Sequence, residues 1–155
     1  MDFRELQEES RVVTDEKIAV GALIIMSLTR EEGLVLKPGK TERRKRLIII
    51  GVDKERGLCY GSLLVNTNMN PQSEYSAEYL SAQYLLRREP HYESFLDYDS
   101  FVDCAEVISI SYEKLLKGEY HGMLEEDDRK AIFNVLEHTK TLSTSMKKRF
   151  GIRRM

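Results

Sequence analysis

The sequence predicts a mainly β domain, a barrel or sandwich of about five to seven short strands with a long helix at its C-terminal end. Two observations lead to this prediction. Short apolar runs rich in isoleucine and valine, such as Leu47 to Val52, alternate with polar and glycine-containing segments that suit turns. Near the end of the chain, apolar residues recur at helical spacing behind four consecutive acidic residues, 125 to 128.

The composition is that of an ordinary globular protein with one domain. The chain has 155 residues, of which 41% are hydrophobic and 32% charged, and its formal net charge is -2. A chain of this length buries ~70% of its unfolded surface, so it needs no disulfide or metal to fold. The small net charge argues against nucleic-acid binding over the whole surface. Any site for a polyanion must therefore be local.

Several features predict a cytoplasmic protein with no cofactor, metal or membrane segment. Cys59 and Cys104 lie in apolar runs, and no cluster of cysteine and histidine has the spacing of metal ligands. The chain begins with acidic residues, and its longest apolar run, Ile18 to Met26, is too short to span a bilayer. We therefore expect buried, reduced thiols and neither a signal peptide nor a transmembrane helix.

Residues 1 to 30 are expected to form an N-terminal extension ahead of a domain that covers residues 31 to 155. A helix is expected within this extension, and the unbroken apolar run Ile18 to Met26 also permits a buried strand. The helix is supported by apolar residues at helical spacing and by a residue that can cap it: Ile18, Ala22 and Ile25, with Thr14 or Asp15.

A short strand and a basic loop are expected next. Gly33 to Pro38 suits a strand at the edge of the sheet, stopped by a proline that lacks a backbone N–H. The loop then places six cations within ten residues against a single acid, Glu42. The cations are Lys37, Lys40, Arg43, Arg44, Lys45 and Arg46. Such a local field is the footprint of a polyanion site, although a solvated surface also explains it.

The basic loop leads directly into a predicted β-hairpin. Leu47 to Val52 forms the first strand, Asp53 to Gly57 the turn, and a second strand ends at Thr67. Because the strands are antiparallel, the beginning of the first at Arg46 lies near the end of the second at Thr67.

The pattern between residues 68 and 111 indicates further strands. Residues 77 to 86 suit a strand or a helical turn, and Phe95 to Asp99 suits a strand. Ser100 to Ser111 suits strands around a bulge or corner. Six aromatic residues in this part of the chain can stack bases or fill a core: Tyr75, Tyr79, Tyr84, Tyr92, Phe95 and Tyr98.

A single helix is expected from residue 125 to residue 148. Its acidic start suits the positive end of the helix dipole, and the cations near its end suit the negative end. Its apolar face is predicted to consist of Ile132, Val135, Leu136, Leu142 and Met146.

Four motifs follow one another in a distinctive order. They are Glu42 to Gly51 (ERRKRLIIIG), the strand that ends at Asn66-Thr67, Asp99 to Val107 (DSFVDCAEV), and Gly122 to Asp127 (GMLEED). In this order, over roughly residues 33 to 145, the chain resembles the MazF/PemK family of toxins. The resemblance implies an SH3-like barrel that dimerises, pairs with an antitoxin protein and cleaves single-stranded RNA without metal. The chain departs from the family pattern at Leu47, where the family prefers proline, and in the long insert 68 to 98.

The resemblance also implies roles for individual residues. Arg46 matches the family arginine before the core strand and can stabilise charge on a phosphate, and Thr67 matches the hydroxyl residue that positions the phosphate. Glu42 matches an acidic residue of the same loop and can accept a proton. The remaining cations are expected to bind RNA: Lys37, Lys40, Arg43, Arg44 and Lys45.

Other classes of function are weighed against the endoribonuclease. A non-catalytic protein-binding module on the same fold, like a gyrase poison or a degenerate toxin, is the main alternative. A DNA-binding protein is disfavoured by the net charge, and a two-histidine ribonuclease by the scattered positions of His91, His121 and His138.

A homodimer is expected to bury one of two apolar stretches, Leu47 to Val52 or Ser100 to Ile110. The motive is that these stretches are too apolar to remain exposed on a small barrel. The acidic lead, with Glu5, Glu8 and Glu9, and the apolar run Ile18 to Met26 after it are expected to dock near the basic loop and to weaken RNA binding, with packing in the core as the alternative.

Overall fold

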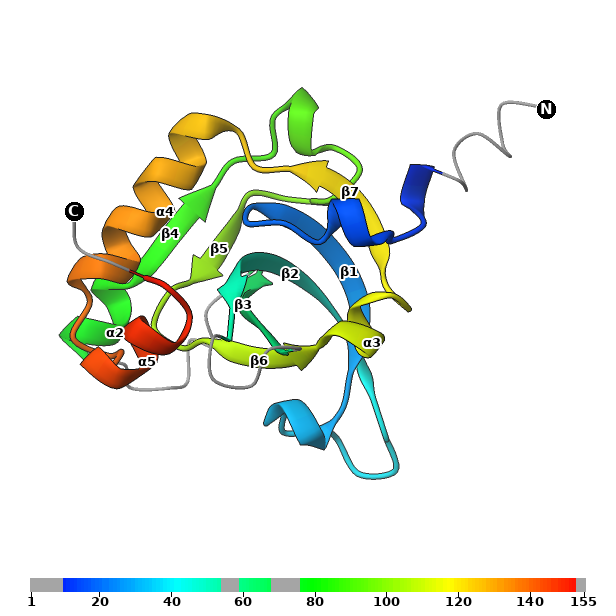
Figure 1. Ribbon diagram of the computed structural model, residues 1–155, viewed down its shortest axis with the longest axis horizontal. Coiled ribbons are helices and arrows are strands. Elements are labelled where there is room, and N and C mark those ends of the chain that lie inside the picture. The colour runs from blue at the N-terminus through cyan, green and yellow to red at the C-terminus, as the bar shows by residue number, and fades with distance from the viewer. Residues whose placement is uncertain (1–9, 54–58, 68–75, 153–155) are drawn as a thin grey trace.

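Seven antiparallel strands curl into a half-barrel in the computed structural model, which describes residues 10–53, 59–67 and 76–152 (Figure 1). The strands lie in the order β4-β5-β3-β2-β1-β7, and β6 pairs with β3 beside this path. The mainly β prediction is confirmed at this level. The strands are β1 (Ala22–Leu28), β2 (Arg43–Val52), β3 (Cys59–Asn66), β4 (Gln83–Leu86), β5 (Ser100–Asp103), β6 (Ile108–Ser111) and β7 (Glu119–Met123).

Short helices join the strands, and two helices follow β7. The α-helices are α2 (Ala77–Ser81), α3 (Tyr112–Leu115), α4 (Glu126–His138) and α5 (Thr144–Arg149), and the 3-10 turns are η1 (Asp15–Lys17), η2 (Arg30–Glu32) and η3 (Pro90–Tyr92). Figure 1 shows α4 lying along the side of the half-barrel that carries β4. Within the described ranges, no helix has the length and apolarity needed to cross a membrane.

The predicted hairpin is confirmed as the antiparallel pair of β2 and β3, although its turn at 54–58 lies outside the described residues. β2 begins four residues earlier than expected, at Arg43, so four of the ten residues of the predicted basic loop belong to the strand. Its apolar half is buried on both faces of the sheet. Leu47 and Ile49 pack into one core cluster, and Ile48 and Ile50 pack into the other. This double burial explains why the run is apolar without alternation.

Because these residues are already buried within one chain, their apolarity is no longer a reason to expect β2 at a dimer interface. Residues 47 to 50 are at most 2% exposed within a single chain. In the second stretch Val102 and Ile110 are also buried. The homodimer stays a prediction, but these two strands no longer provide a reason for it.

β1 corrects the expected boundary at residue 30. The strand alternative for Ile18 to Met26 is confirmed from Ala22 onward, and the helix alternative is wrong. β1 pairs with β2 on one side and β7 on the other, so it lies inside the sheet rather than in an extension before it. Residues 1–9, and with them the expected docking of the acidic lead, lie outside the described residues.

Two short strands predicted from local pattern are wrong. Residues 33 to 38 do not form a strand. Val35, in the middle of this segment, is 94% exposed, so the segment does not pack against the sheet as an edge strand would. Phe95 and Leu96 are both buried in a turn, where their N–H groups donate to the carbonyl of Tyr92. Two consecutive buried residues cannot alternate between the faces of a strand.

The segment from Ser100 to Ser111 turns a corner, as predicted. β5 pairs with the end of β3 at Val65 and Asn66, whereas β6 pairs with its beginning from Cys59 to Ser62. One edge of β3 thus pairs with two different strands along its length, and the sheet curls there. Residues 77 to 86 combine both expected alternatives, since α2 is followed directly by β4.

The two cysteines differ in burial. Cys104 follows β5 and is buried, and both thiols are free. Desolvation, together with the neighbouring charge of Asp103, raises the pKa of Cys104 to about 12. Cys59 is only partly buried, so the prediction of burial is confirmed for Cys104 alone.

The expected single helix from 125 to 148 is wrong, because α4 ends at His138 and α5 begins at Thr144. Thr139 adopts an extended conformation at the C-terminal end of α4. The side chain of Lys147 folds back from α5 and donates to the carbonyls of Glu137 (2.8 Å) and Thr139 (2.9 Å). These bonds satisfy carbonyls that a helix end leaves without partners, and so stabilise the break.

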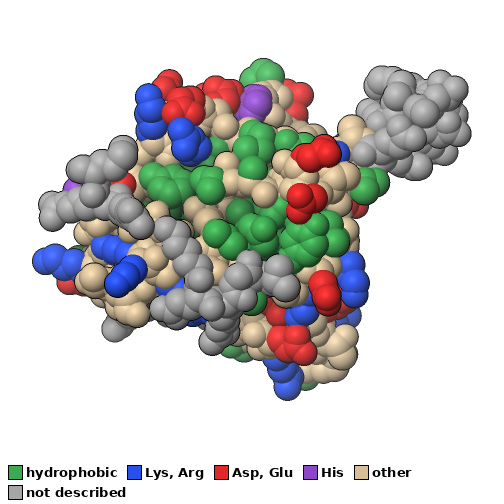
Figure 2. Space-filling view, in the orientation of Figure 1, with side chains coloured by type: hydrophobic (Ala, Val, Ile, Leu, Met, Phe, Trp, Pro, Cys, Tyr) green, Lys and Arg blue, Asp and Glu red, His purple; other side chains and the backbone are tan. Residues whose placement is uncertain are grey.

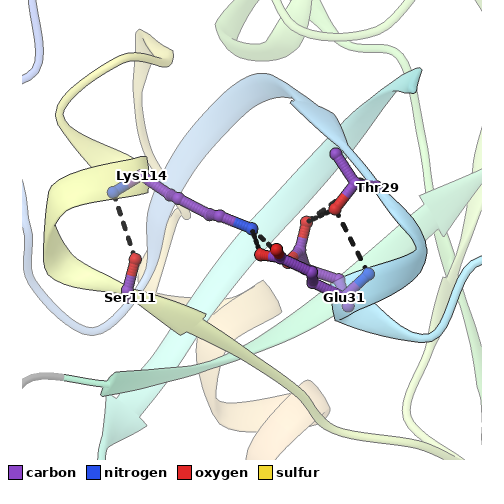
Figure 3. Close-up of polar contacts among 5 residues, drawn as sticks. Thr29, Glu31, Ser111 and Lys114 are labelled. Carbon is purple, nitrogen blue, oxygen red and sulfur yellow. Dashed lines mark hydrogen bonds and ion pairs between the residues drawn. The ribbon is translucent and has the colours of Figure 1, made fainter. Parts of the chain in front are cut away.

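A polar cluster fastens the turn after β1 to α3 (Figure 3). The ammonium of Lys114 donates to Glu31 and Glu32, at 2.6 Å each, and Ser111 caps α3 through the backbone N–H of Lys114. Glu32 also accepts from the backbone N–H of Thr29 at 2.9 Å. The cluster anchors the beginning of the segment that leads into β2.

We expect this cluster to make folding stability sensitive to acid. Burial acts to raise the pKa of Glu32, but the bonds from Lys114 and Thr29 outweigh it, so the pKa lies below its usual value of 4.5. A carboxylate with a lowered folded-state pKa stabilises the protein fully above pH 4.5, and this contribution is lost as the pH falls through the folded-state pKa. Lys114→Met should reduce the unfolding free energy at pH 7 by about 1 to 2 kcal/mol and flatten its decline toward pH 3. Urea unfolding at several pH values measures both effects.

Lys117→Met provides the matched control, because Lys117 is exposed one turn away. Its unfolding free energy should follow the wild-type pH curve. A Lys114→Met protein with an unchanged pH profile would show that the Glu32 contacts contribute nothing to stability.

The surface seen in Figure 2 has apolar side chains gathered over its middle, with Lys and Arg in separate groups around them. Positive charge on this face is therefore dispersed. A binding site for a polyanion must come from a local cluster, as the net charge of the chain also requires.

Candidate nucleic-acid interface

The beginning of β2 and the end of β3 enclose an open hollow of about 320 Å³. Four consecutive cations of β2 and three residues at the end of β3 line it: Arg43, Arg44, Lys45, Arg46, Val65, Asn66 and Thr67. We call it the basic hollow. Antiparallel pairing places the two ends side by side, with Arg46 opposite Val65.

The cations of β2 point alternately to the two faces of the sheet. Arg44 and Arg46 share the face of Ile48, and both have acidic partners. Arg46 donates to the backbone carbonyl of Phe95 at 2.6 Å and to the carboxylate of Asp97 at 2.8 Å. Arg44 pairs with Glu119 at 2.7 Å.

Lys45 lies on the opposite face and has a neutral partner. Its ammonium donates to the amide oxygen of Asn66 at 2.6 Å. Burial lowers the pKa of Lys45, and the charges of Arg43 and Arg46 lower it further. Lys45 therefore sits in an excess of positive charge, which an anion in the hollow would relieve.

The structure brings together most of the predicted site residues but not all of them. Arg46 and Thr67 both line the basic hollow, as do three of the predicted RNA-binding cations, Arg43, Arg44 and Lys45. Glu42 is exposed before β2 and does not line the hollow. Lys37 and Lys40 are exposed in the preceding segment and do not line it either.

The register does not place Arg46 directly opposite Thr67. Arg46 pairs with Val65, and Thr67 follows the end of β3. A hairpin predicted from sequence fixes which strands pair. It does not fix their register when the turn geometry is unknown.

Glu119 and His121 are polar residues of the neighbourhood that sequence reasoning missed. Glu119 accepts from Arg44, and its carboxylate lies 3.3 Å from Nε2 of His121. Burial acts to raise the pKa of Glu119, but the bonds to His121 and Arg44 outweigh it, so the pKa is lowered. Glu119 and His121 are two residues apart in β7, so their side chains lie on the same face of the sheet. This spacing would have predicted the pair if the strand had been recognised from the sequence.

The arrangement is suited to holding phosphate groups. Arginine forks and a lysine ammonium donate to phosphate oxygens, and the hydroxyl of Thr67 adds a neutral donor. The nearby carboxylates, Asp97 and Glu119, are each paired with an arginine. In the parts of the chain that the structure describes, no group of three or more His, Cys, Asp or Glu could hold a metal ion.

The geometry therefore defines a local cationic site on a curled antiparallel sheet. Comparison with known proteins adds no relative, since no protein-family model and no curated protein matches the chain.

Proposed function

We propose that this protein is a metal-independent endoribonuclease that binds single-stranded RNA at the basic hollow. In this proposal the half-barrel is an SH3-like barrel of the MazF/PemK type, and the protein is the toxin of a toxin–antitoxin pair. One observation carries the proposal. Four consecutive cations of β2 meet Thr67 around one open hollow, and of the four only Arg44 and Arg46 have an ion pair among the described residues.

Binding would begin with the cations that lack acidic partners. Arg43 and Lys45 attract the phosphates, and Thr67 donates its hydroxyl to a phosphate oxygen. A duplex presents its phosphates on a wide, stiff helix, whereas a single strand can bend into a hollow of about 320 Å³. The proposed substrate is therefore single-stranded.

Cleavage would proceed through the ribose next to the bound phosphate. The 2′-oxygen attacks phosphorus, its proton passes to a base, and the bond to the 5′-oxygen breaks as that oxygen gains a proton. The products are a 2′,3′-cyclic phosphate and a 5′-hydroxyl. Arg46 or Arg44 would stabilise the charge that develops on the phosphate oxygens, because a guanidinium stays protonated. Glu42 could accept the proton only after the segment before β2 moves toward the hollow.

A non-catalytic binding module is the second candidate, and one observation favours it. Arg46 is already held by Phe95 and Asp97, so its guanidinium is engaged before any ligand arrives. A module of this kind needs no proton acceptor in the hollow. Under either candidate the proposed protein partners are an antitoxin and a second copy of the chain.

Incubation with single-stranded RNA in EDTA tests the enzyme proposal directly. Wild type should produce fragments that end in 2′,3′-cyclic phosphate. Arg46→Ala should lower the cleavage rate about a hundredfold or more, because loss of one donor to a developing oxyanion costs ~3 kcal/mol. Thr67→Ala should lower it by a smaller factor.

Two kinds of control separate chemistry from charge. Asp97→Asn removes the ion pair but keeps Arg46, so its rate should stay within about twofold of wild type or rise, since exposed pairs contribute ~1 kcal/mol or less. Lys37 and Lys40 lie outside the basic hollow, so Lys37→Ala and Lys40→Ala should change the cleavage rate little. RNA binding without cleavage, weakened by Lys45→Gln, would favour the binding module. A folded wild type that neither binds nor cleaves a broad panel of RNAs would refute both candidates.

A further inference from the structure

We propose that a second hollow, beside His121 on β7, holds a further phosphate of the RNA strand bound at the basic hollow. The inference rests on the proposed function and extends it to a second subsite. This hollow measures about 300 Å³ and is lined by Ser10, Arg11, Ser94, Tyr120, His121 and Gly122. We call it the His121 hollow.

Three segments far apart in the sequence build this hollow. An antiparallel bridge between Val12 and Glu119 fastens the segment before β1 along the edge of β7, and so places Arg11 near His121. The turn after η3 contributes Ser94. The fold thus holds the cation Arg11 beside the imidazole of His121, and among the described residues Arg11 has no ion pair.

The lining suits an anionic oxygen group. Arg11 supplies a charged fork of donors, and the hydroxyl of Ser94 supplies a neutral one. Gly122 has φ +101°, and nothing lies within 4 Å of the position a β-carbon would take. The backbone of this wall is therefore open to close approach by a ligand.

His121 contributes a buried nitrogen without a partner. Its side chain is only 2% exposed, and Nε2 faces Glu119. Within the described part of the chain, Nδ1 is buried and has no hydrogen-bond partner. In the protonated ring Nδ1 carries a hydrogen, and the negative charge of a phosphate in the adjoining hollow favours this protonated form.

The two hollows are connected through charged side chains. Arg44 lines the basic hollow and pairs with Glu119, which in turn contacts His121. β1 alone separates β2 from β7, so the two strands lie ~10 Å apart at the usual spacing between neighbours. Arg44 neutralises the carboxylate between the hollows, so one RNA strand can cross from the first hollow to the second.

Proton uptake provides a signature of this subsite. In the free protein, burial lowers the pKa of His121 most, the cations Arg11 and Arg44 lower it further, and Glu119 raises it. A phosphate in the hollow favours the protonated ring and raises this pKa. Between the two values binding takes up a proton, so RNA affinity should increase as the pH falls.

The test measures affinity for a single-stranded RNA octanucleotide and a dinucleotide, with cleavage blocked by a 2′-deoxy substitution at the scissile position. Arg11→Gln should weaken octanucleotide binding several-fold and reduce the slope of log affinity against log salt by ~0.7. It should leave dinucleotide binding unchanged, because a dinucleotide fills the basic hollow alone. Lys130→Gln, an exposed cation on α4, is the matched control and should change neither quantity.

The pH readout separates a phosphate contact from a structural role. Wild-type affinity should increase about threefold or more between pH 7.5 and pH 5.5, and His121→Gln should remove this increase. His138→Gln, at the end of α4, should keep it. Melting temperatures confirm that each variant is folded.

Each outcome decides between the proposals. If wild type binds no RNA, the proposed function fails and this inference fails with it. If Lys45→Gln weakens octanucleotide binding but Arg11→Gln and His121→Gln change neither the salt slope nor the pH dependence, the basic hollow stands and the His121 hollow is not a subsite.

Discussion

Arg149→Met should destabilise the protein by about 3 to 5 kcal/mol, because it removes one partner of a buried ion pair. Asp53, just after β2, is fully buried, and Arg149 at the end of α5 donates to it through Nε at 2.6 Å. A second guanidinium nitrogen lies 2.5 Å from the same oxygen. Denaturant unfolding with a constant slope measures the loss.

Lys148→Met is the matched control, since the neighbouring Lys148 is exposed. It should change the unfolding free energy by less than about 0.5 kcal/mol. The double variant Asp53→Asn/Arg149→Met should recover part of the loss, because the uncompensated charge is gone. Equal losses in the single and double variants would show that the pair itself does not account for the effect.

Gly51→Ala should also unfold or strongly destabilise the protein, by about 3 kcal/mol or more. A β-carbon at Gly51 would lie 2.2 Å from the backbone carbonyl oxygen of Phe150, and one at Gly61 would lie 2.6 Å from the ring of Phe150. Gly51 of β2 and Gly61 of β3 form the surface against which Phe150 of the C-terminal segment packs. Glycine is needed here for close approach, not for an unusual backbone angle.

The two glycines should respond differently when the ring of Phe150 is removed. Phe150→Ala should relieve the cost of Gly61→Ala, because the obstacle at Gly61 is mainly a side chain. It should not relieve Gly51→Ala, whose obstacle is a backbone carbonyl. A double-mutant cycle on unfolding free energies measures both coupling energies. Equal coupling energies at both positions would contradict the distinction between a side-chain obstacle at Gly61 and a backbone obstacle at Gly51.

The strongest local patterns predicted elements correctly. The hairpin of β2 and β3, the corner between β5 and β6, and the beginning of the C-terminal helix near residue 126 follow from apolar runs, turn residues and an acidic start. In each of these the pattern is dense enough to specify structure without distant partners. The cations from Arg43 to Arg46 were recognised for the same reason, since their number within a short stretch is visible in sequence.

Elements with weak patterns were missed or misassigned. β7, from Glu119 to Met123, contains a histidine and a glycine and lacks alternation, and it is a strand because β1 pairs with it. The break between α4 and α5 depends on Lys147, which reaches back to carbonyls eight and ten residues earlier. Propensity is a weak prior where tertiary contacts supply the hydrogen bonds.

The sequence by itself determined that the chain is mainly β, that its apolar hairpin belongs to the core, and that its positive charge is concentrated at the beginning of β2. Only the tertiary structure decided what these cations face. The register set Val65 rather than Thr67 opposite Arg46, and pairing of β1 with β7 brought Glu119 and His121 into the same neighbourhood. A local pattern fixes which residues share a strand, whereas register and strand order depend on contacts between different segments. These segments lie up to about twenty residues apart for β2 and β3 and about a hundred for β1 and β7.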